Sequence, residues 1–299
     1  MGYSVAVFGS CARNDFDNLS DKDILFVYDD NFYPSKEIKN MQSNGWNCSE
    51  YTYKEFQNIS SLGSLFVQHI KQDSIIKKDD DNILKNILLS YTPKKDYTAD
   101  IIQAEKNFTI LKYIENSSIG ALWALDVISV LLRNYSVLRL ANNNIYEFSL
   151  SRMYSFMMEL YGFDDREFQY LCKLRYFKYI YRHKQQCDFH EIKKFLSDIL
   201  AILSQKLSLD IRVNFLQSKD FIIKQLEALM NEKGSGYKRL RIFESIYNAV
   251  PQIHGDIVVK KYEKMICNPS KYAYTFQCAD FIDHISLNYS LRDSFEKYL

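Results

Sequence analysis

The chain has almost no excess of one charge. Its 38 Lys and Arg residues stand against 37 Asp and Glu residues, which leaves a formal net charge of +1. Broad, charge-driven binding to nucleic acid needs many uncompensated cations, so this balance argues against it. RNA is therefore less favoured as a partner than a small molecule or a protein, unless a local basic stripe supplies the charge.

Proline and glycine are scarce, with four and nine residues respectively in 299. This scarcity favours helices over a sandwich of many short strands and turns. The hydrophobic content of 47% is ample for buried cores and excludes a globally disordered chain. The length exceeds that of one average domain, so two or three domains are expected.

No Cys-x-x-Cys pair occurs, and no N-terminal segment combines basic and apolar residues like a signal peptide. No run of about 18 consecutive apolar residues is present to cross a bilayer. Scattered cysteines favour reduced, mostly buried thiols over a zinc site or a disulfide framework. We therefore expect a soluble, cytoplasmic protein without a membrane span. The cysteines are Cys11, Cys48, Cys172, Cys187, Cys267 and Cys278.

The most informative stretch lies near the beginning of the chain. The apolar run Val5–Phe8 stops at Gly9–Ser10, and a second apolar run, Ile24–Val27, follows Asp21 and Asp23. Two short apolar runs beside turn residues predict two adjacent strands. Alternation along a strand places the two acids on one face, where they repel each other. A divalent cation such as Mg²⁺ offsets that repulsion, because it prefers hard oxygen ligands.

The turn between the two runs has the composition of a phosphate site. Gly9 allows the backbone to approach a phosphate closely, and the Ser10 hydroxyl with nearby N–H groups can bind phosphate oxygens. Arg13 lies one turn further on, where its guanidinium can add charge-assisted bonds. A phosphate-binding turn beside two carboxylates is what metal-assisted phosphoryl or nucleotidyl transfer requires. The plainer interpretation is a Gly-Ser turn next to a solvated strand start.

This pattern of Gly-Ser, a gap, and Ser-Asp-x-Asp before apolar residues resembles the signature of the polymerase-β-like nucleotidyltransferase superfamily. It is most similar to the minimal, antibiotic-modifying and adenylylating branch. The resemblance implies an enzyme that depends on Mg²⁺ (or Mn²⁺) and transfers NMP from an NTP, with ATP expected, to a hydroxyl acceptor. It implies Asp21 and Asp23 as catalytic metal ligands. It also implies four nucleotide-binding residues, which are Gly9, Ser10, Arg13 and Ser20.

The same superfamily commonly carries a third carboxylate on a later strand. We expect a third strand over Trp46–Tyr53, and Glu50 is its only acid. The resemblance therefore makes Glu50 the candidate for the third catalytic and metal-binding carboxylate, or for the base that accepts the acceptor's proton. Glu55 is the fallback. His69, near the end of an apolar helical face, is expected to be a structural histidine.

Residues 92–96 combine proline, charge and turn formers, and this predicts a domain boundary. We expect an α+β protein with a small N-terminal nucleotidyltransferase sheet and flanking helices over residues 1–96. An all-helical bundle domain is expected over 97–207 and a C-terminal helical segment over 208–299. The expected helices are Lys36–Gln42, Lys54–Gln72 with a break at Ser60–Ser61 or at Gly63, Ile119–Leu140, Phe148–Leu160, Glu167–Arg182 and Phe189–Leu207. Residues 77–82 are expected to form an exposed turn.

One of these helices is basic and rich in tyrosine. Interleaved cations and aromatic rings can stack on and neutralise an RNA or a nucleotide. A partly exposed amphipathic helix with snorkelling Lys and Arg side chains explains the pattern equally well. The residues concerned are Tyr170, Lys173, Arg175, Tyr176, Lys178, Tyr179, Tyr181, Arg182, His183 and Lys184.

The acceptor stays open among three classes: a small molecule such as an aminoglycoside, a protein side chain, and an RNA 3′ end. An alternative function is a catalytically weak or inactive module that binds nucleotide or a protein partner. A place in a bacterial defence or toxin–antitoxin system rests on family analogy alone. A third hypothesis is a helical interaction protein whose N-terminal resemblance is accidental.

Overall fold

The computed structural model describes residues 2–233 and 236–250. The chain forms two compact units, the first from Met1–Ile102 and Tyr135–Leu160, the second from Gln103–Asn134 and Tyr161–Leu299. An N-terminal mixed sheet with helices precedes a mostly helical region, which confirms the expected α+β class. The division into segments 1–96, 97–207 and 208–299 stays a prediction, and residues 251–299 lie outside the described part.

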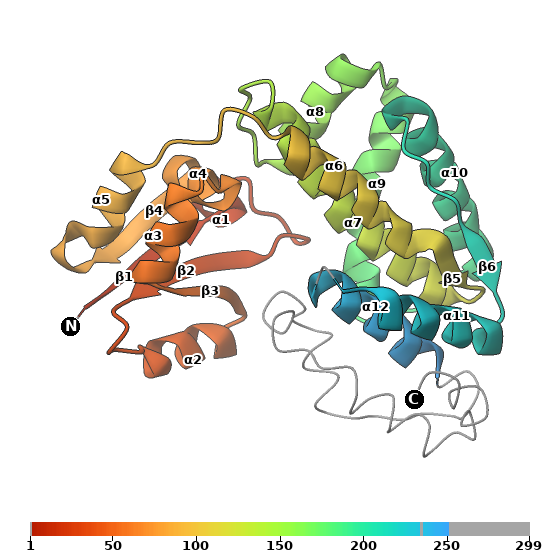
Figure 1. The fold of residues 1–299 in the computed structure, drawn as a ribbon, viewed down its shortest axis with the longest axis horizontal. Coiled ribbons are helices and arrows are strands. Elements are labelled where there is room, and N and C mark those ends of the chain that lie inside the picture. Colours follow the sequence, from red (N-terminus) through yellow and green to blue (C-terminus); the bar gives the residue numbers. More distant parts are fainter. Residues whose placement is uncertain (1, 234–235, 251–299) are drawn as a thin grey trace. The chain divides into compact units, whose positions relative to one another are not determined.

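The sheet of the first unit has four strands in the order β3-β2-β1-β4 (Figure 1). The strand β1 (Tyr3–Phe8) pairs antiparallel with both β2 (Lys22–Tyr28) and β4 (Ser74–Asp79), and β3 (Trp46–Thr52) runs parallel to β2. The first three strands lie where the sequence predicts them. The expectation of an exposed turn over residues 77–82 is wrong in its first part, because β4 extends to Asp79 before the 3₁₀ turn η1 (Asp80–Asn82).

Both faces of this sheet are covered, and alternation along the strands decides which side chain meets which cover. Ala6, Phe8 and Leu25 belong to a core shared with α3, α4 and α5, whereas Val5 and Phe26 pack on the other face with α2 (Figure 1). Asp23 therefore shares the face of Phe8 and Leu25. The covering helices are α2 (Ser35–Ser43), α3 (Tyr53–Ser61), α4 (Leu65–Asp73) and α5 (Ile83–Ser90).

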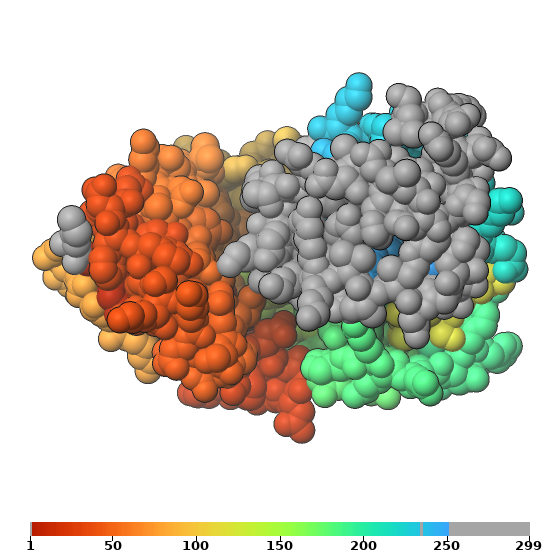
Figure 2. Space-filling model, turned by 90° about the horizontal axis from the view of Figure 1, so that it is seen from below, coloured from red at the N-terminus to blue at the C-terminus, as the bar shows by residue number. Residues whose placement is uncertain are grey.

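The predicted break between α3 and α4 is present at Gly63. This glycine has φ +66°, and a Cβ there would lie 2.7 Å from the Lys94 backbone nitrogen. Only glycine suits such a left-handed, crowded position. The first unit also contains the last part of α7 (Ser118–Ala141) and most of α8 (Leu150–Tyr161). In the space-filling view of Figure 2 its N-terminal strands and helices appear in red to orange.

The second unit is built mainly from helices around a core that includes Trp123, Phe177, Phe221 and Phe243. The expectation of helix throughout 97–207 is wrong at β5, which pairs parallel with β6. Its elements are the end of α6 (Thr98–Asn107), η2 (Phe108–Lys112), β5 (Tyr113–Glu115), the first part of α7, α9 (Asp165–Arg182), α10 (Phe189–Leu207), β6 (Asn214–Leu216), α11 (Ser218–Asn231) and α12 (Gly236–Ala249).

Among the described residues one helix, α7, is long and apolar enough to pass a membrane-span test by length and composition. Of its most apolar window, 72% is buried inside the protein, which is typical of a core helix. Four cysteines in the described part of the chain are free thiols, and each is partly exposed, so the expectation that they are mostly buried is wrong for these four. These are Cys11, Cys48, Cys172 and Cys187, while Cys267 and Cys278 lie outside the described residues.

Candidate active site

The turn at Gly9 connects β1 to a single helical turn, α1 (Ser10–Arg13). Gly9 has φ 71° and ψ −147°, a backbone conformation that residues other than glycine rarely adopt. Its carbonyl oxygen accepts hydrogen bonds from the backbone N–H groups of Ala12 and Arg13, both at 3.1 Å. The turn is therefore narrow and sharply folded, with Ser10 as the first residue of the helix.

The carboxylate of Asp23 lies directly against this turn. Asp23 is the strand partner of Phe8, the last residue of β1. A Cβ built on Gly9 would stand 3.3 Å from Asp23 Oδ2. Burial and the nearby Asp23 charge raise the pKa of the Cys11 thiol on α1. Asp21 is exposed and immediately precedes β2.

A neighbour that sequence reasoning did not select is Asn47. The parallel pairing of β3 with β2 sets it opposite Asp23, and its Nδ2 donates to Asp23 Oδ1 at 2.9 Å. A fixed hydrogen bond to one carboxylate oxygen restricts the rotation of the acid. The sequence places Asn47 near the beginning of the predicted third strand. It does not show which residue of the second strand lies opposite Asn47, because strand register is not visible in a local pattern.

The structure does not bring Glu50 to the two aspartates. Glu50 pairs with Phe26, on the opposite face of the sheet from Asp23. There it accepts hydrogen bonds from the Tyr33 hydroxyl at 2.7 Å and from Gln42 Nε2 at 3.4 Å. Burial and this bond to Glu50 raise the pKa of Tyr33 to about 12. This placement gives no support to Glu50 as the third carboxylate of the site.

Glu55, the second candidate for the third carboxylate, forms hydrogen bonds at the beginning of α3. Its carboxylate accepts from the Thr52 backbone N–H at 2.8 Å, and its own N–H donates to the Thr52 hydroxyl at 3.2 Å. This is a capping box, which satisfies the first N–H groups of α3. Glu55 therefore has a structural explanation that needs no metal.

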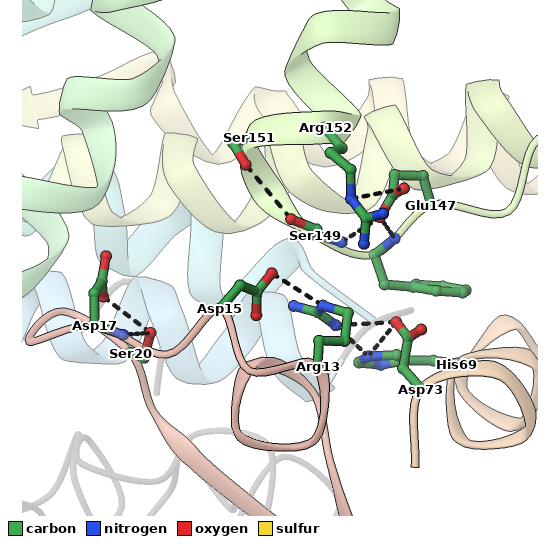
Figure 3. A network of polar contacts seen from close by, with 11 residues as sticks. Arg13, Asp15, Asp17, Ser20, His69, Asp73, Glu147, Ser149, Ser151 and Arg152 are labelled. Atoms are coloured by element: carbon green, nitrogen blue, oxygen red, sulfur yellow. Dashed lines mark hydrogen bonds and ion pairs between the residues drawn. The ribbon is translucent and has the colours of Figure 1, made fainter.

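Two of the predicted nucleotide-binding side chains bond to the protein's own carboxylates (Figure 3). Arg13 donates from Nη1 to Asp73 at 3.0 Å and from Nε to Asp15 at 3.1 Å. Ser20 donates to Asp17 Oδ1 at 2.9 Å and closes a small turn ahead of Asp21. Their assignment to nucleotide binding stays a prediction.

His69 is a buried histidine of α4, as expected, with 7% of its surface exposed. Its ring stacks on Phe148 with centroids 4.5 Å apart and meets Phe8 edge-on at 5.5 Å. Its Nε2 lies 3.6 Å from Asp73 Oδ2, one helical turn further along. The spacing of four residues between this His and Asp was visible in the sequence, since such pairs face each other on a helix.

The basic, tyrosine-rich helix α9 uses several of its polar side chains inside the second unit. The Tyr181 hydroxyl donates to Glu244, and Arg182 donates to Asp126. Tyr170 donates to Asp198 and stacks on a neighbouring ring. These contacts favour the amphipathic-helix interpretation over an RNA-binding face.

The oxygen donors near Gly9 have the chemistry that a hard cation prefers. Asp23 lies against the turn and Asp21 precedes Asp23 by two residues, and Mg²⁺ usually combines one or two carboxylates with substrate phosphates. Within residues 2–233 and 236–250 no cluster of three His, Cys, Asp or Glu side chains with metal-binding geometry is found. The assignment of Asp21 and Asp23 as metal ligands stays a prediction.

Residues 2–109 match the model of a protein family described as nucleotidyltransferase domain. The matched range contains the Gly9 turn, both aspartates and the whole four-stranded sheet. The match confirms the resemblance drawn from the sequence, and with it nucleotidyl transfer from an NTP as the activity of this domain. A search among curated proteins found no match to the chain.

Proposed function

We propose, from the nucleotidyltransferase domain formed by residues 2–109, that this chain transfers a nucleoside monophosphate from ATP to a hydroxyl acceptor and releases pyrophosphate. The observation that carries the proposal is the position of Asp23. Its carboxylate lies against the Gly9 turn, at the adjoining ends of two neighbouring strands. A turn for phosphates and a carboxylate for a cation are thus within reach of one triphosphate.

Each residue of this site has a role that its place supports. Asp21 and Asp23 would hold a divalent cation, Mg²⁺ or Mn²⁺, and Asn47 keeps the Asp23 carboxylate oriented. When bound, the cation supplies charge neutralisation on the triphosphate and on the leaving pyrophosphate. Gly9 lets the backbone approach the terminal phosphates, and Ser10 offers a hydroxyl and the first N–H of α1.

The transfer itself is an in-line displacement. The acceptor hydroxyl oxygen forms a bond to the α-phosphorus, the bond from that phosphorus to the bridging oxygen breaks, and pyrophosphate leaves. The hydroxyl proton is released as the new phosphoester forms. Little covalent chemistry is needed from the protein, so positioning and electrostatic stabilisation carry the rate enhancement.

Asp21→Asn and Asp23→Asn test the proposal most directly. Each replaces a charged ligand by a neutral one of the same size, so we expect pyrophosphate release to fall by at least about 100-fold. Mn²⁺ affinity, measured without turnover by paramagnetic relaxation, should fall in parallel. Asp30→Asn is the matched control, because Asp30 is an exposed acid beyond the other end of β2. Full activity in either active-site variant would refute the assignment.

Glu50→Gln distinguishes a cation site formed by Asp21 and Asp23 alone from one that also includes Glu50. Because Glu50 lies on the far face of the sheet, activity and Mn²⁺ affinity should change by less than about twofold, near the limit for surface substitutions. A loss comparable to that of Asp23→Asn would restore Glu50 as the third carboxylate.

The acceptor is to be found by incubation with each labelled NTP and Mg²⁺, alone and with cell extract. Mass analysis of the labelled product distinguishes a small molecule, a modified protein and an extended RNA. The small net charge and the internal contacts of α9 favour the first two classes. A protein that becomes labelled would also identify a partner.

A second candidate function is nucleotide binding without turnover, as a module that responds to nucleotide or to a partner protein. The observation in its favour is Asn47, an amide at the strand position opposite Asp23 where an acid would strengthen metal binding. NTP binding with no pyrophosphate release, with and without extract, would support this function. Asn47→Ala should then weaken Mn²⁺ affinity, and pyrophosphate release should be absent in the variant as in the wild type.

A further inference from the structure

The Arg13 side chain is held by carboxylates rather than left pointing to solvent. Two of its three guanidinium nitrogens donate at about 3 Å, Nη1 to Asp73 and Nε to Asp15 (Figure 3). Only 12% of the side chain is exposed. A guanidinium with donors committed in this way is fixed in orientation, because charge-assisted bonds to two carboxylates restrain it from two directions.

The partner of Arg13 is itself rigidly placed. Asp73 ends α4, with 9% of its side chain exposed, and His69 lies one turn earlier on the same helix. The Nε2 atom of His69 lies 3.6 Å from Asp73 and 3.4 Å from Arg13 Nη1. The histidine ring is in turn packed on Phe148 and against the edge of Phe8, the residue that precedes Gly9.

The helical turn that carries Arg13 is short and lies against β1, β2 and β4. The element α1 contains four residues, none of them buried, and no side chain caps its beginning. An isolated helix of that length has no stability of its own, because nucleation is unfavourable. Its position therefore depends on tertiary contacts, and the bonds of Arg13 are the charged ones at its C-terminal end.

The charges of this cluster depend on one another. Burial raises the pKa of Asp73, and the bond and charge of Arg13 act in the opposite direction. At Asp15 burial also raises the pKa, but the bond and charge of Arg13 outweigh it and the net shift is downward. Removal of the guanidinium thus affects both carboxylates at once.

We propose that Arg13 is a positioning residue that acts through Asp73 to fix α1, and with it the Gly9–Ser10 turn that receives the NTP phosphates. Arg13 does not bind phosphate in this arrangement. The effect of Arg13 on nucleotide binding rests on the proposed function. The effect of Arg13 on the position of the turn does not depend on any nucleotide.

A double-mutant cycle tests the coupling. Arg13→Gln and Asp73→Ala should each weaken binding of Mg²⁺-ATP by about 10-fold, and the double variant should be no weaker than the single ones. Titration calorimetry on the full chain measures the ATP affinities. In steady-state kinetics the variants should have a higher KM for ATP and a kcat close to that of the wild type. If Arg13→Gln costs as much in the Asp73→Ala background as in the wild type, Arg13 contacts phosphate and the inference is overturned. Tighter ATP binding in Asp73→Ala overturns it too.

Hydrogen exchange of residues 9–13 in the absence of nucleotide provides the second measurement. Both single variants should speed exchange in this segment, since the turn loses its tie to α4. Unchanged exchange together with weaker ATP binding would contradict a positioning role. If the wild type binds no ATP, the proposed function fails, and the exchange rates alone decide the inference.

Arg212→Gln is the matched control. It removes an arginine of the second unit whose side chain is 85% exposed and whose partner is Asp210. Exchange over residues 9–13 and ATP affinity should stay within about twofold of the wild type, as for other surface substitutions. A control that behaved like Arg13→Gln would show a general charge effect and overturn the inference.

Discussion

Each of the two units contains a network of arginine and aspartate, but the surroundings of the two networks differ. In the first unit Arg13 and Asp73 retain exposed side-chain fractions of 12% and 9% and lie beside the Gly9 turn. In the second unit the side chains of Asp126 and Arg241 are fully buried, although Arg182, which also binds Asp126, keeps 23% of its side chain exposed. Removal of one partner from a buried pair leaves an uncompensated charge, so the Asp126 network should be the more costly one to break.

The Asp126 network joins three helices that are far apart in the sequence. Arg182 on α9 donates to Asp126 on α7 from Nε at 2.9 Å and from Nη2 at 2.7 Å, and Arg241 on α12 donates to the same carboxylate. Arg241 also pairs with Glu244 at 2.9 Å. Two guanidinium groups and two carboxylates thus balance in charge. Such balance is required where water cannot screen them.

The largest effect is expected from Asp126→Ala. This change leaves two arginines without their shared partner in the interior, and breaking a buried pair costs about 3–5 kcal/mol. Urea unfolding of the full chain measures the loss. Asp210→Ala is the control, because its pair with Arg212 is mostly exposed, with side-chain fractions of 74% and 85%. A loss below about 1 kcal/mol in Asp126→Ala would place it with exposed pairs and remove the contrast between the networks.

The same substitution should change the acid dependence of stability. Burial raises the pKa of Asp126, but the charges of Arg241 and Arg182 outweigh it and lower the pKa below its ordinary value. The ionised carboxylate therefore stabilises the fold above about pH 4, and this contribution is lost as pH falls through the folded pKa. Burial raises the pKa of Glu244, so its contribution runs in the opposite direction.

Urea midpoints at a series of pH values test this sign. The difference between wild type and Asp126→Ala should shrink as pH falls below about 4. A difference that grows on acidification would contradict the lowered pKa.

A smaller effect is expected from Tyr181→Phe. The Tyr181 hydroxyl donates to Glu244 at 2.6 Å and accepts from Asn248 at 2.8 Å. Its loss leaves a buried carboxylate oxygen without this donor, at a cost of about 1–3 kcal/mol. Tyr176→Phe, on the exposed side of the same helix, should change the unfolding free energy by less than about 0.5 kcal/mol. Equal effects in both variants would show that burial of the network does not matter.

The smallest effect is expected from Arg152→Gln in the first unit. Its pair with Glu147 spans 3.3 Å, but 63% of the arginine side chain is exposed. Exposed pairs contribute about 0–1 kcal/mol, so the unfolding midpoint should hardly move. A loss similar to that of Asp126→Ala would mean that exposure is a poor guide to the strength of these networks.

Much of the N-terminal sheet could be predicted from local pattern. The strands around Val5–Phe8 and Ile24–Val27 and the third strand at Trp46 lie where apolar runs and turn residues place them. The edge strand β4 could not be predicted from local pattern. Ile75 and Ile76 are followed by lysines and acids, which are typical of a solvated turn. The existence of β4 depends on antiparallel pairing with β1, which no local pattern encodes.

Local pattern also predicted one part of the site, the Gly9 turn with Asp23, but not the part that depends on strand pairing. Adjacent strands bring Asp23 to the Gly9 turn, and that follows from two neighbouring segments of sequence. The identity of the residue opposite Asp23 depends on the register of β3 against β2. A register that pairs Asn47 with Asp23 sends Glu50 to the other face, because side chains alternate.

By itself, the sequence determined the two strands, the turn between them and the acids that follow, since these depend on interactions within some twenty residues of chain. Tertiary structure alone decided that Arg13 bonds to Asp73, sixty positions away, and that Asp126 is neutralised by Arg182 and Arg241. The physical reason is that a charged side chain takes the partner that folding brings within about 3 Å, and burial then strengthens that choice.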